Sequence, residues 1–200
     1  MNISRESDVS NENEAMESAA QQERRLVAMA QKNPDDFKHL FNKYYDTIFN
    51  YALRRTGNAH LANDVAANTF LKALDQINNF QWRGSSFSAW LYRIATNEIF
   101  QVHRKSKRTI RLTSEVKDRL QDDNSSDSAL LEAEEMVARN EKFKQIHAAL
   151  SKLKIKYQTV LTLRYFEDKS IKEIAAILNM PENTVKTHIR RGLTHLKEYL

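Results

Sequence analysis

The chain has 200 residues, a formal net charge of +5 and 41% hydrophobic residues, enough for one medium domain or two small ones. Because only three Gly and two Pro are present, there is little material for β-turns or Gly-rich phosphate loops, and we expect an all-α protein. The absence of cysteine excludes disulfides, thiolate catalysis and Cys-based zinc sites. No apolar run suits a signal peptide or a membrane span, which indicates a cytoplasmic protein without membrane insertion.

The N-terminal part of the chain changes from a polar segment to a helical one. Residues 1–25 are rich in Ser, Asn and Glu, and we interpret them as a disordered or weakly helical tail. Apolar residues at three- and four-residue spacings then predict a helix with a buried stripe from Phe37 to Ala52, ended by Gly57 as its C-terminal cap. A second helix is expected from about 59 to 76. Its predicted buried residues are Leu61, Val65, Phe70, Leu71 and Leu74.

A loop over 78–86 leads into a third helix, predicted from about Phe87 to Lys107. At about 100° per residue, a mixed set of side chains falls within an arc of roughly 80°. This set is Trp90, Arg93, Asn97, Gln101 and Arg104. Aromatic, cationic and amide groups together suit single-stranded nucleic acid, whose unstacked bases need stacking partners and hydrogen bonds. The basic run 103–111 extends the positive surface, and the alternative is that Trp90 belongs to the core.

Composition changes again over 113–135, where eight acidic residues stand against Lys117 and Arg119. Such a segment has little to bury, so we interpret it as a flexible acidic linker. The helical pattern resumes at 136 and continues to 200. The sequence therefore predicts two small helical domains, 26–112 and 136–200, joined by a tether.

Residues 170–191 have the pattern of a helix-turn-helix. Ser170 and Glu173 have the spacing of a capping box, and Pro181 suits the first turn of the next helix. Residues predicted to face inward on that helix are Val185, Ile189, Leu193 and Leu196, and those facing outward are Lys186, Thr187, Arg190, Arg191 and Thr194. A cationic second helix fits the major groove, although an ordinary hairpin with a solvated basic face has the same pattern. His188 and His195 are not spaced as metal ligands, and we expect no metal site.

Both halves together resemble the sigma-70 family of bacterial transcription initiation factors, specifically its extracytoplasmic-function (ECF) group. "NDVAANTFLKAL" (63–74) is similar to the family's core-polymerase-binding helix, and "FQWRGSSFSAWLYRIATNEIFQVHRKSKR" (80–108) to its promoter −10 segment. "LKIKYQTVLTLRYFEDKSIKEIAAILNMPENTVKTHIRRGLTHL" (153–196) is similar to its −35-binding domain. The order and spacing are those of the family, so 26–112 would be a sigma-2-like domain of three or four helices and 136–200 a sigma-4-like domain.

The resemblance also implies three sets of contact residues. Those for the beta and beta-prime subunits of core RNA polymerase are Asp64, Val65, Asn68, Thr69, Phe70, Lys72 and Ala73. Those for −10 DNA are Trp82, Arg83, Ser85, Trp90, Arg93, Asn97, Gln101, Arg104, Lys105 and Arg108. Those for −35 DNA are Asn183, Thr184, Lys186, Thr187, His188, Arg190 and Arg191. The family usually has an acidic residue where this chain has Asn68, and frequently Asp where it has Gln101.

The leading hypothesis is a dissociable promoter-specificity subunit, monomeric when free, with no active site and no cofactor. The resemblance implies core RNA polymerase, promoter DNA and an anti-sigma factor as partners. The alternative is a stand-alone helix-turn-helix regulator, which usually needs a dimer partner for tight binding. An enzyme has little support, because the sequence has no Gly-rich phosphate loop, no H-E-x-x-H motif and no cysteine.

Overall fold

The computed structural model describes residues 20–82, 86–112 and 141–199, and the regular elements in these ranges are all helical, as predicted. A helix over 20–32 comes first. It is followed by η1 (Pro34–Asp36), α2 (Phe37–Thr56), α3 (Ala59–Gln76), η2 (Ile77–Asn79), α4 (Phe87–Leu112), α6 (Glu141–Ser151), α7 (Ile155–Tyr165), α8 (Ile171–Leu178) and α9 (Glu182–Leu196). The predicted acidic linker, 113–135, lies outside the described residues, and no described helix is long and apolar enough to cross a bilayer.

The turn between α2 and α3 is closed by two caps. Gly57 adopts the left-handed conformation with φ 66°, and its N–H donates to the Leu53 carbonyl at 2.8 Å, so the predicted C-terminal cap is confirmed. Asn58 then caps α3, because its side chain accepts from the Leu61 N–H at 2.8 Å. A Cβ at position 57 would lie 2.3 Å from the imidazole Cε1 of His147, so glycine also lets α6 approach this turn.

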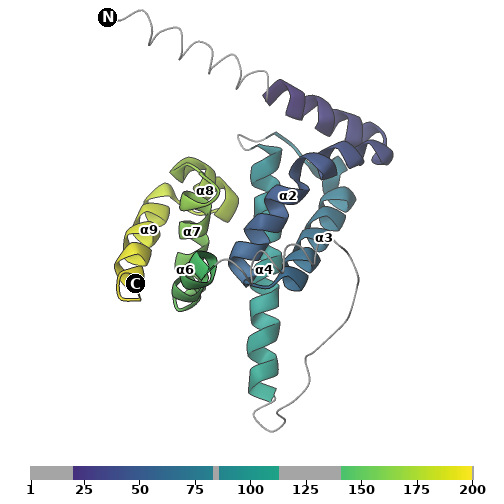
Figure 1. Cartoon of the computed structure of the whole chain (residues 1–200). Coiled ribbons are helices and arrows are strands. Elements are labelled where there is room, and N and C mark those ends of the chain that lie inside the picture. The colour runs from purple at the N-terminus through teal and green to yellow at the C-terminus, as the bar shows by residue number, and fades with distance from the viewer. Residues whose placement is uncertain (1–19, 83–85, 113–140, 200) are drawn as a thin grey trace, which may run out of the picture.

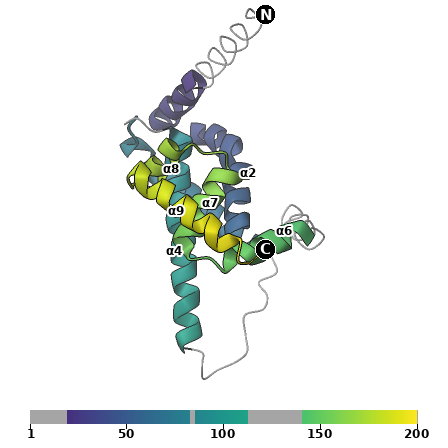
Figure 2. The same ribbon diagram turned by 90° about the vertical axis from the view of Figure 1, so that its left-hand side faces the viewer.

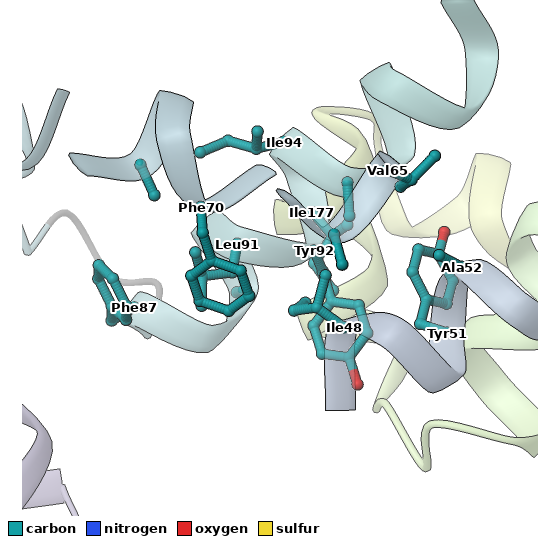
Figure 3. Packing of buried hydrophobic residues seen from close by; sticks show 14 of the residues in the cluster. Ile48, Tyr51, Ala52, Val65, Phe70, Phe87, Leu91, Tyr92, Ile94 and Ile177 are labelled. Atoms are coloured by element: carbon teal, nitrogen blue, oxygen red, sulfur yellow. The ribbon is translucent and has the colours of Figure 1, made fainter. Parts of the chain in front are cut away.

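The described residues form a small hydrophobic cluster that includes Leu150, Tyr157 and Leu161, and a larger hydrophobic core that crosses the predicted domain boundary. Leu40, Ile48 and Tyr51 of α2, together with α3 and α4, form the N-terminal part of this larger core. Ile174 and Ile177 of α8 are fully buried in the same core, and Figure 3 shows Ile177 among the side chains of this core. The two halves, 20–112 and 141–199, are therefore packed together in this structure.

The arrangement leaves α9 on the outside of the molecule. In Figure 1, α7 and α8 lie between α9 and the pair α2 and α4. Figure 2, turned so that this side faces the viewer, shows α9 in front with α7 and α8 behind it. The last turns of α4 extend beyond the packed helices in both views. The second helix of the helix-turn-helix thus has one face on α7 and α8 and the other in solvent.

The helix-turn-helix begins and turns as its sequence predicts. The Ser170 side chain accepts from the Glu173 N–H, and the Glu173 carboxylate accepts from the Ser170 N–H, so the capping box is present. Asn179 ends α8 with φ 50°. Pro181 is the N-cap of α9, one position before the first helical residue. These caps fix the short connection between α8 and α9, and so the direction of α9 relative to α8.

Two sequence predictions are corrected by the fold. The predicted boundary between tail and domain, at 25 and 26, falls inside the helix 20–32, where Glu23 is buried. Leu61 and Leu71 were expected in the core, but they are 38% and 60% exposed. Their neighbours Val65 and Phe70 are buried as predicted. Helical periodicity identified the apolar residues of α3, but not which of its two apolar stripes faces the core.

Candidate nucleic-acid interface

The predicted −10 surface on α4 divides into an aromatic end and a polar stripe. At the aromatic end, the Trp90 ring packs 5.0 Å from Phe80 and 5.4 Å from Phe87, so Trp90 is half-buried against the core. Trp82 lies 5.1 Å from Phe80 and is 37% exposed. The outward aromatic group in the described residues is therefore Trp82 more than Trp90, which supports the alternative that Trp90 is a core residue.

The polar residues of α4 follow one side of the helix, as the projection predicted. We call Arg93, Asn97, Gln101 and Arg104 the α4 stripe. Arg93, Asn97 and Arg104 are exposed, and Gln101 is half-buried with its amide donating to Glu98 at 3.1 Å. Lys105 is also exposed. Arg83, Ser85 and the side chain of Arg108 lie outside the described part of the chain.

Arg93 is already engaged by the other half of the protein. Its Nε donates to the carbonyl of Ile177 at 3.2 Å, and its Nη2 donates to the carbonyl of Ala176. Both carbonyls belong to the last turn of α8, where backbone oxygens lack an intrahelical partner and the helix dipole is negative. A guanidinium suits this site because it is cationic and carries several donors in one plane. One end of the α4 stripe is thus occupied by the first helix of the helix-turn-helix.

Glu167, in the turn after α7, joins the halves at a second point. Its carboxylate accepts from Arg54 at 2.7 Å and from the Tyr92 hydroxyl at 2.6 Å, and its side chain is 5% exposed. Burial and the neighbouring Glu167 charge raise the pKa of Tyr92, so this hydroxyl stays protonated and remains a donor. Arg54 and Tyr92 come from α2 and α4, so one carboxylate bridges three elements.

A third contact buries a charge between α2 and α7. The Arg55 guanidinium donates to Gln158 at 2.7 Å and to Thr159 at 3.0 Å. Arg55 is 4% exposed, and this burial lowers its pKa. Its Nε has no hydrogen-bond partner. An interface that combines apolar packing with buried polar groups resembles those between domains that separate more than it resembles a uniform core.

The outer face of α9 has the opposite character. We call Asn183, Lys186, Arg190, Arg191 and Thr194 the α9 face, and all of them are exposed. Its Lys and Arg side chains make no ion pair with a carboxylate among the described residues. The side chains are free to meet phosphates or base edges in a major groove. The inward residues Val185 and Ile189 hold the helix on the core.

Two predicted −35 residues lie away from this outward direction. The His188 ring packs 5.7 Å from Tyr157 of α7, and its Nδ1 is buried without a hydrogen-bond partner. Burial, with the charges of Lys156 and Arg191, lowers the pKa of His188. Thr187 is half-buried and donates to the Asn183 carbonyl at 2.8 Å. His188 is half-buried, so its ring packs on α7 in this structure and its contact with −35 DNA stays a prediction.

The predicted polymerase-binding set on α3 is also divided by burial. Val65, Thr69, Phe70 and Ala73 are buried in the protein's own core, so their side chains are not available to a partner in this structure. Lys72 is half-buried and pairs with Glu98 at 2.6 Å. Asp64 and Asn68 are exposed. The sequence motif thus located the helix correctly but mixed its inner and outer residues.

The exposed residues that sequence reasoning missed lie beside Asp64 and Asn68. Leu61 and Leu71 fall three or four residues from them and so share the same side of α3. We call these four residues the α3 stripe. Two exposed leucines with polar groups between them on one side of α3 form a candidate surface for a protein partner. The signal in the sequence was the second apolar register, Leu61 and Leu71, offset from the buried one.

The described residues contain no group of three or more His, Asp or Glu side chains arranged to hold a metal ion. The three surfaces differ in the groups that they expose. The α3 stripe combines leucines with polar groups, the α4 stripe combines cations and amides beside an aromatic ring, and the α9 face is cationic.

Comparison with known proteins agrees with this organisation. The family model for Sigma-70 region 2 matches residues 40–109, and the model for Sigma-70, region 4 matches residues 143–196. The ECF RNA polymerase sigma factor SigW of Bacillus subtilis (strain 168) is 35% identical over 181 residues, which covers 88% of this chain and 95% of SigW. The RNA polymerase sigma factor YlaC of the same organism is 31% identical over 167 residues, covering 84% of this chain and 93% of YlaC.

Solved structures share the fold. The sigma factor RpoE of Bartonella quintana, in complex with the anti-sigma factor NepR, has a TM-score of 0.62 and 21% identity over 82% of this chain and 96% of that chain. CnrH, in complex with the cytosolic domain of CnrY, has a TM-score of 0.62 and 23% identity over 88% of this chain and 95% of the CnrH chain. These matches do not favour a stand-alone regulator. With both family regions matched in order and SigW aligned over nearly its whole length, the chain belongs to the sigma-70 family of RNA polymerase sigma factors, in the ECF group, and is a promoter-specificity factor.

Proposed function

We propose that this sigma factor uses its three surfaces for three separate partners. The α3 stripe docks on the beta and beta-prime subunits of core RNA polymerase, because it offers exposed Leu61 and Leu71 beside polar groups. The α4 stripe and Trp82 capture the melted −10 strand, and the α9 face binds the −35 duplex. The observation that carries the proposal is the pairing of a stacking surface with a groove-binding helix in one chain. The factor itself has no active site and works in the cytoplasm.

The contacts between the halves add a condition to this function. Two nitrogens of Arg93, Nε and Nη2, are directed at carbonyls of α8, so only part of its guanidinium is left for a DNA phosphate or base. Glu167 and Ile177 hold α7 and α8 against the same side of α2 and α4. We infer that the packed arrangement is the free state, and that the halves separate when polymerase and promoter bind. Separation releases Arg93 to the −10 strand.

An anti-sigma factor is a further proposed partner. The structure of RpoE, which has a similar fold, contains the anti-sigma factor NepR, and the structure of CnrH contains the cytosolic domain of CnrY. In this chain, the exposed α3 stripe is the apolar surface that a competing protein would need to cover to block polymerase binding. Competition of an anti-sigma candidate with core polymerase for this stripe, tested with Leu71→Ser, would examine that expectation.

The direct test is reconstitution with bacterial core polymerase. The purified chain should start transcripts from a cognate promoter that core polymerase ignores, and promoters can be found by mapping transcript start sites after overexpression. Substitutions in the −10 and −35 elements should each reduce initiation. Absence of core binding together with nanomolar specific binding of the free chain to duplex DNA would instead identify a stand-alone regulator.

A further inference from the structure

The helix 20–32 lies outside both family-model matches, the first of which begins at residue 40, yet it packs against the proposed −10 surface. Glu23, Val27 and Gln31 recur every four residues and so share one side of this helix. Val27 is 1% exposed and belongs to the core, which fixes the helix in place. The two polar residues on this side, Glu23 and Gln31, contact different segments. Glu23 contacts the first turn of α4, and Gln31 contacts the segment before α4.

Glu23 holds the first turn of α4. Its Oε1 accepts from the backbone N–H of Ser88 at 3.2 Å, and the Tyr44 hydroxyl donates to the same carboxylate. The first N–H groups of a helix have no intrahelical acceptor, and a negative charge there is favoured by the helix dipole. Burial and the Glu23 carboxylate raise the pKa of Tyr44, so Tyr44 stays protonated and can donate. Glu23 is thus an N-terminal cap supplied from another helix.

Gln31 holds the segment that leads to Trp82. Its Nε2 donates to the Ile77 carbonyl at 3.0 Å and to the Phe80 carbonyl at 3.1 Å. Both hydrogens of one amide are therefore used to fix the first residue of η2 and the residue that follows η2. Arg24, about two turns of helix from Gln31, places its guanidinium 5.5 Å from the centre of the Trp82 ring. The backbone and the ring of this segment are held from the same helix.

Together these contacts connect two parts of the proposed −10 surface that lie on either side of residues 83–85. The segment ending at Trp82 is tied to Gln31 and Arg24, and the start of α4 is tied to Glu23. Because one rigid helix carries all three side chains, their spacing fixes the separation between Trp82 and the first turn of α4. That separation decides whether a base stacked on Trp82 can also meet the α4 stripe.

We propose that Glu23 and Gln31 are positioning residues for −10 recognition, which set promoter selectivity without touching DNA. This inference rests on the proposed −10 role of Trp82 and the α4 stripe. It assigns a function in recognition to the N-terminal helix 20–32. The unpaired −10 strand binds the surface formed by Trp82 and the α4 stripe. The helix 20–32 does not touch this strand but holds the two parts of the surface at a fixed separation.

Gln31→Glu tests the proposal with a side chain of the same shape. A carboxylate cannot donate, so it would face the carbonyls of Ile77 and Phe80 with a like partial charge. Gln22, exposed on the same helix, provides the matched control Gln22→Glu. In the free chain, amide hydrogen exchange over 77–90 should rise in Gln31→Glu and in Glu23→Ala, and should stay unchanged in Gln22→Glu. Glu23→Gln keeps an acceptor for Ser88 and should retain most of the protection.

The functional measurement is the ratio of initiation on a cognate promoter to that on one with a substituted −10 element, using the variant with core polymerase. Loss of both amide hydrogen bonds should lower this ratio by about three- to tenfold. Binding to core polymerase should stay the same, because the α3 stripe is untouched. Gln31→Ala provides a second variant if Gln31→Glu fails to fold.

The outcomes separate this inference from the proposed function. If Gln31→Glu and Gln22→Glu discriminate −10 elements equally, the positioning role is wrong even when the wild-type chain initiates specifically. A fall in the ratio that matches an equal fall in core binding would show general damage and also overturn it. If the wild-type chain directs no promoter-specific initiation, the proposed function fails, and unchanged exchange over 77–90 would reject the helix contacts independently.

Discussion

The α4 stripe and the α9 face carry similar cationic groups, but these groups differ in their contacts within the protein. Arg93 of α4 donates hydrogen bonds to two of the last carbonyls of α8. Arg190 and Arg191 of α9 are exposed and make no ion pair among the described residues. The difference follows from position. The α4 stripe lies where the halves meet, and α9 lies on the far side of α7 and α8, as Figure 1 shows.

This comparison implies an order of events at a promoter. The α9 face can meet duplex DNA without any rearrangement, although one small basic helix supplies limited affinity. Full use of the α4 stripe requires Arg93 to leave α8, and separation of the halves costs the contacts of Arg93, Glu167 and Ile177. Binding to core polymerase can offset this cost only by favouring the separated state. In the proposed order, the packed state therefore keeps the Arg93 end of the α4 stripe on α8 until polymerase is present.

Ile177→Ala should have the largest effect, because it removes buried side chain from the core that the halves share. Ile177 is 1% exposed, and truncation of such a residue typically costs about 2–5 kcal/mol in the free energy of unfolding. Urea denaturation followed by circular dichroism measures the loss. Arg190→Ala, on the exposed α9 face, should stay within about 0.5 kcal/mol of the wild type. Equal stability of Ile177→Ala and wild type would contradict the shared core.

Arg190→Ala should instead act on DNA. Loss of a phosphate or base contact costs about 1–3 kcal/mol, so initiation that depends on the −35 element should fall by about five- to 150-fold. Core polymerase binding should remain intact, since Arg190 lies on the half opposite to the α3 stripe. Lys152→Ala removes the same charge from an exposed position outside α9 and controls for net charge. Loss of core binding in Arg190→Ala would count against the division of surfaces.

Glu167→Gln tests whether the packed state restrains the α4 stripe. The amide keeps the shape but loses the charge that Arg54 and Tyr92 bind, which should shift the balance toward separation by about 1 kcal/mol. Because the chain has no cysteine, Asn42→Cys on α2 and Lys197→Cys after α9 can carry a fluorophore pair. Energy transfer should fall in Glu167→Gln and not in the exposed control Glu198→Gln. Unchanged transfer would mean that Glu167 does not hold the halves.

Much of the fold could be predicted because local signals determined it. The Ser170 and Glu173 capping box and the Gly57 cap use residues within a few positions of each other, so a linear pattern contains the whole interaction. The buried residues Val65 and Phe70 follow from helical spacing. The order of the matched segments then indicated the family, which the relatives confirm.

The rest depended on contacts between distant segments. Glu23 looks like one more polar residue of a tail until Ser88 and Tyr44 are placed beside it. Leu61 and Leu71 follow an apolar period that the sequence cannot assign to a core or to a partner, since the chemistry is the same in both. His188 lies between basic residues, but the rotation of α9 on α7 turns it toward the core side. These assignments depend on which face of a helix packs against the core, and contacts between distant segments decide that face.

The smallest expected effect concerns the contact between α6 and α2, on the side of the interface away from the α4 stripe. Burial, with the nearby Arg55 charge, lowers the pKa of His147 from its usual 6.5. In a range of pH below 6.5, His147 therefore binds a proton in the unfolded chain but not in the folded protein. The contribution of neutral His147 to the free energy of unfolding is fully present above the unfolded pKa. It is lost as pH falls from about 6.5 toward the lower folded pKa.

Urea midpoints measured across that range should decline toward acid more steeply in the wild type than in His147→Gln. The difference between the two curves isolates His147 from the carboxylates, which titrate at lower pH. The imidazole lies directly against Gly57, so a protonated ring would place its charge near Arg55 at the turn where the halves touch. Parallel curves would mean that protonation does not oppose this packing. The restraint on the α4 stripe would then come from Arg93, Glu167 and the shared core alone.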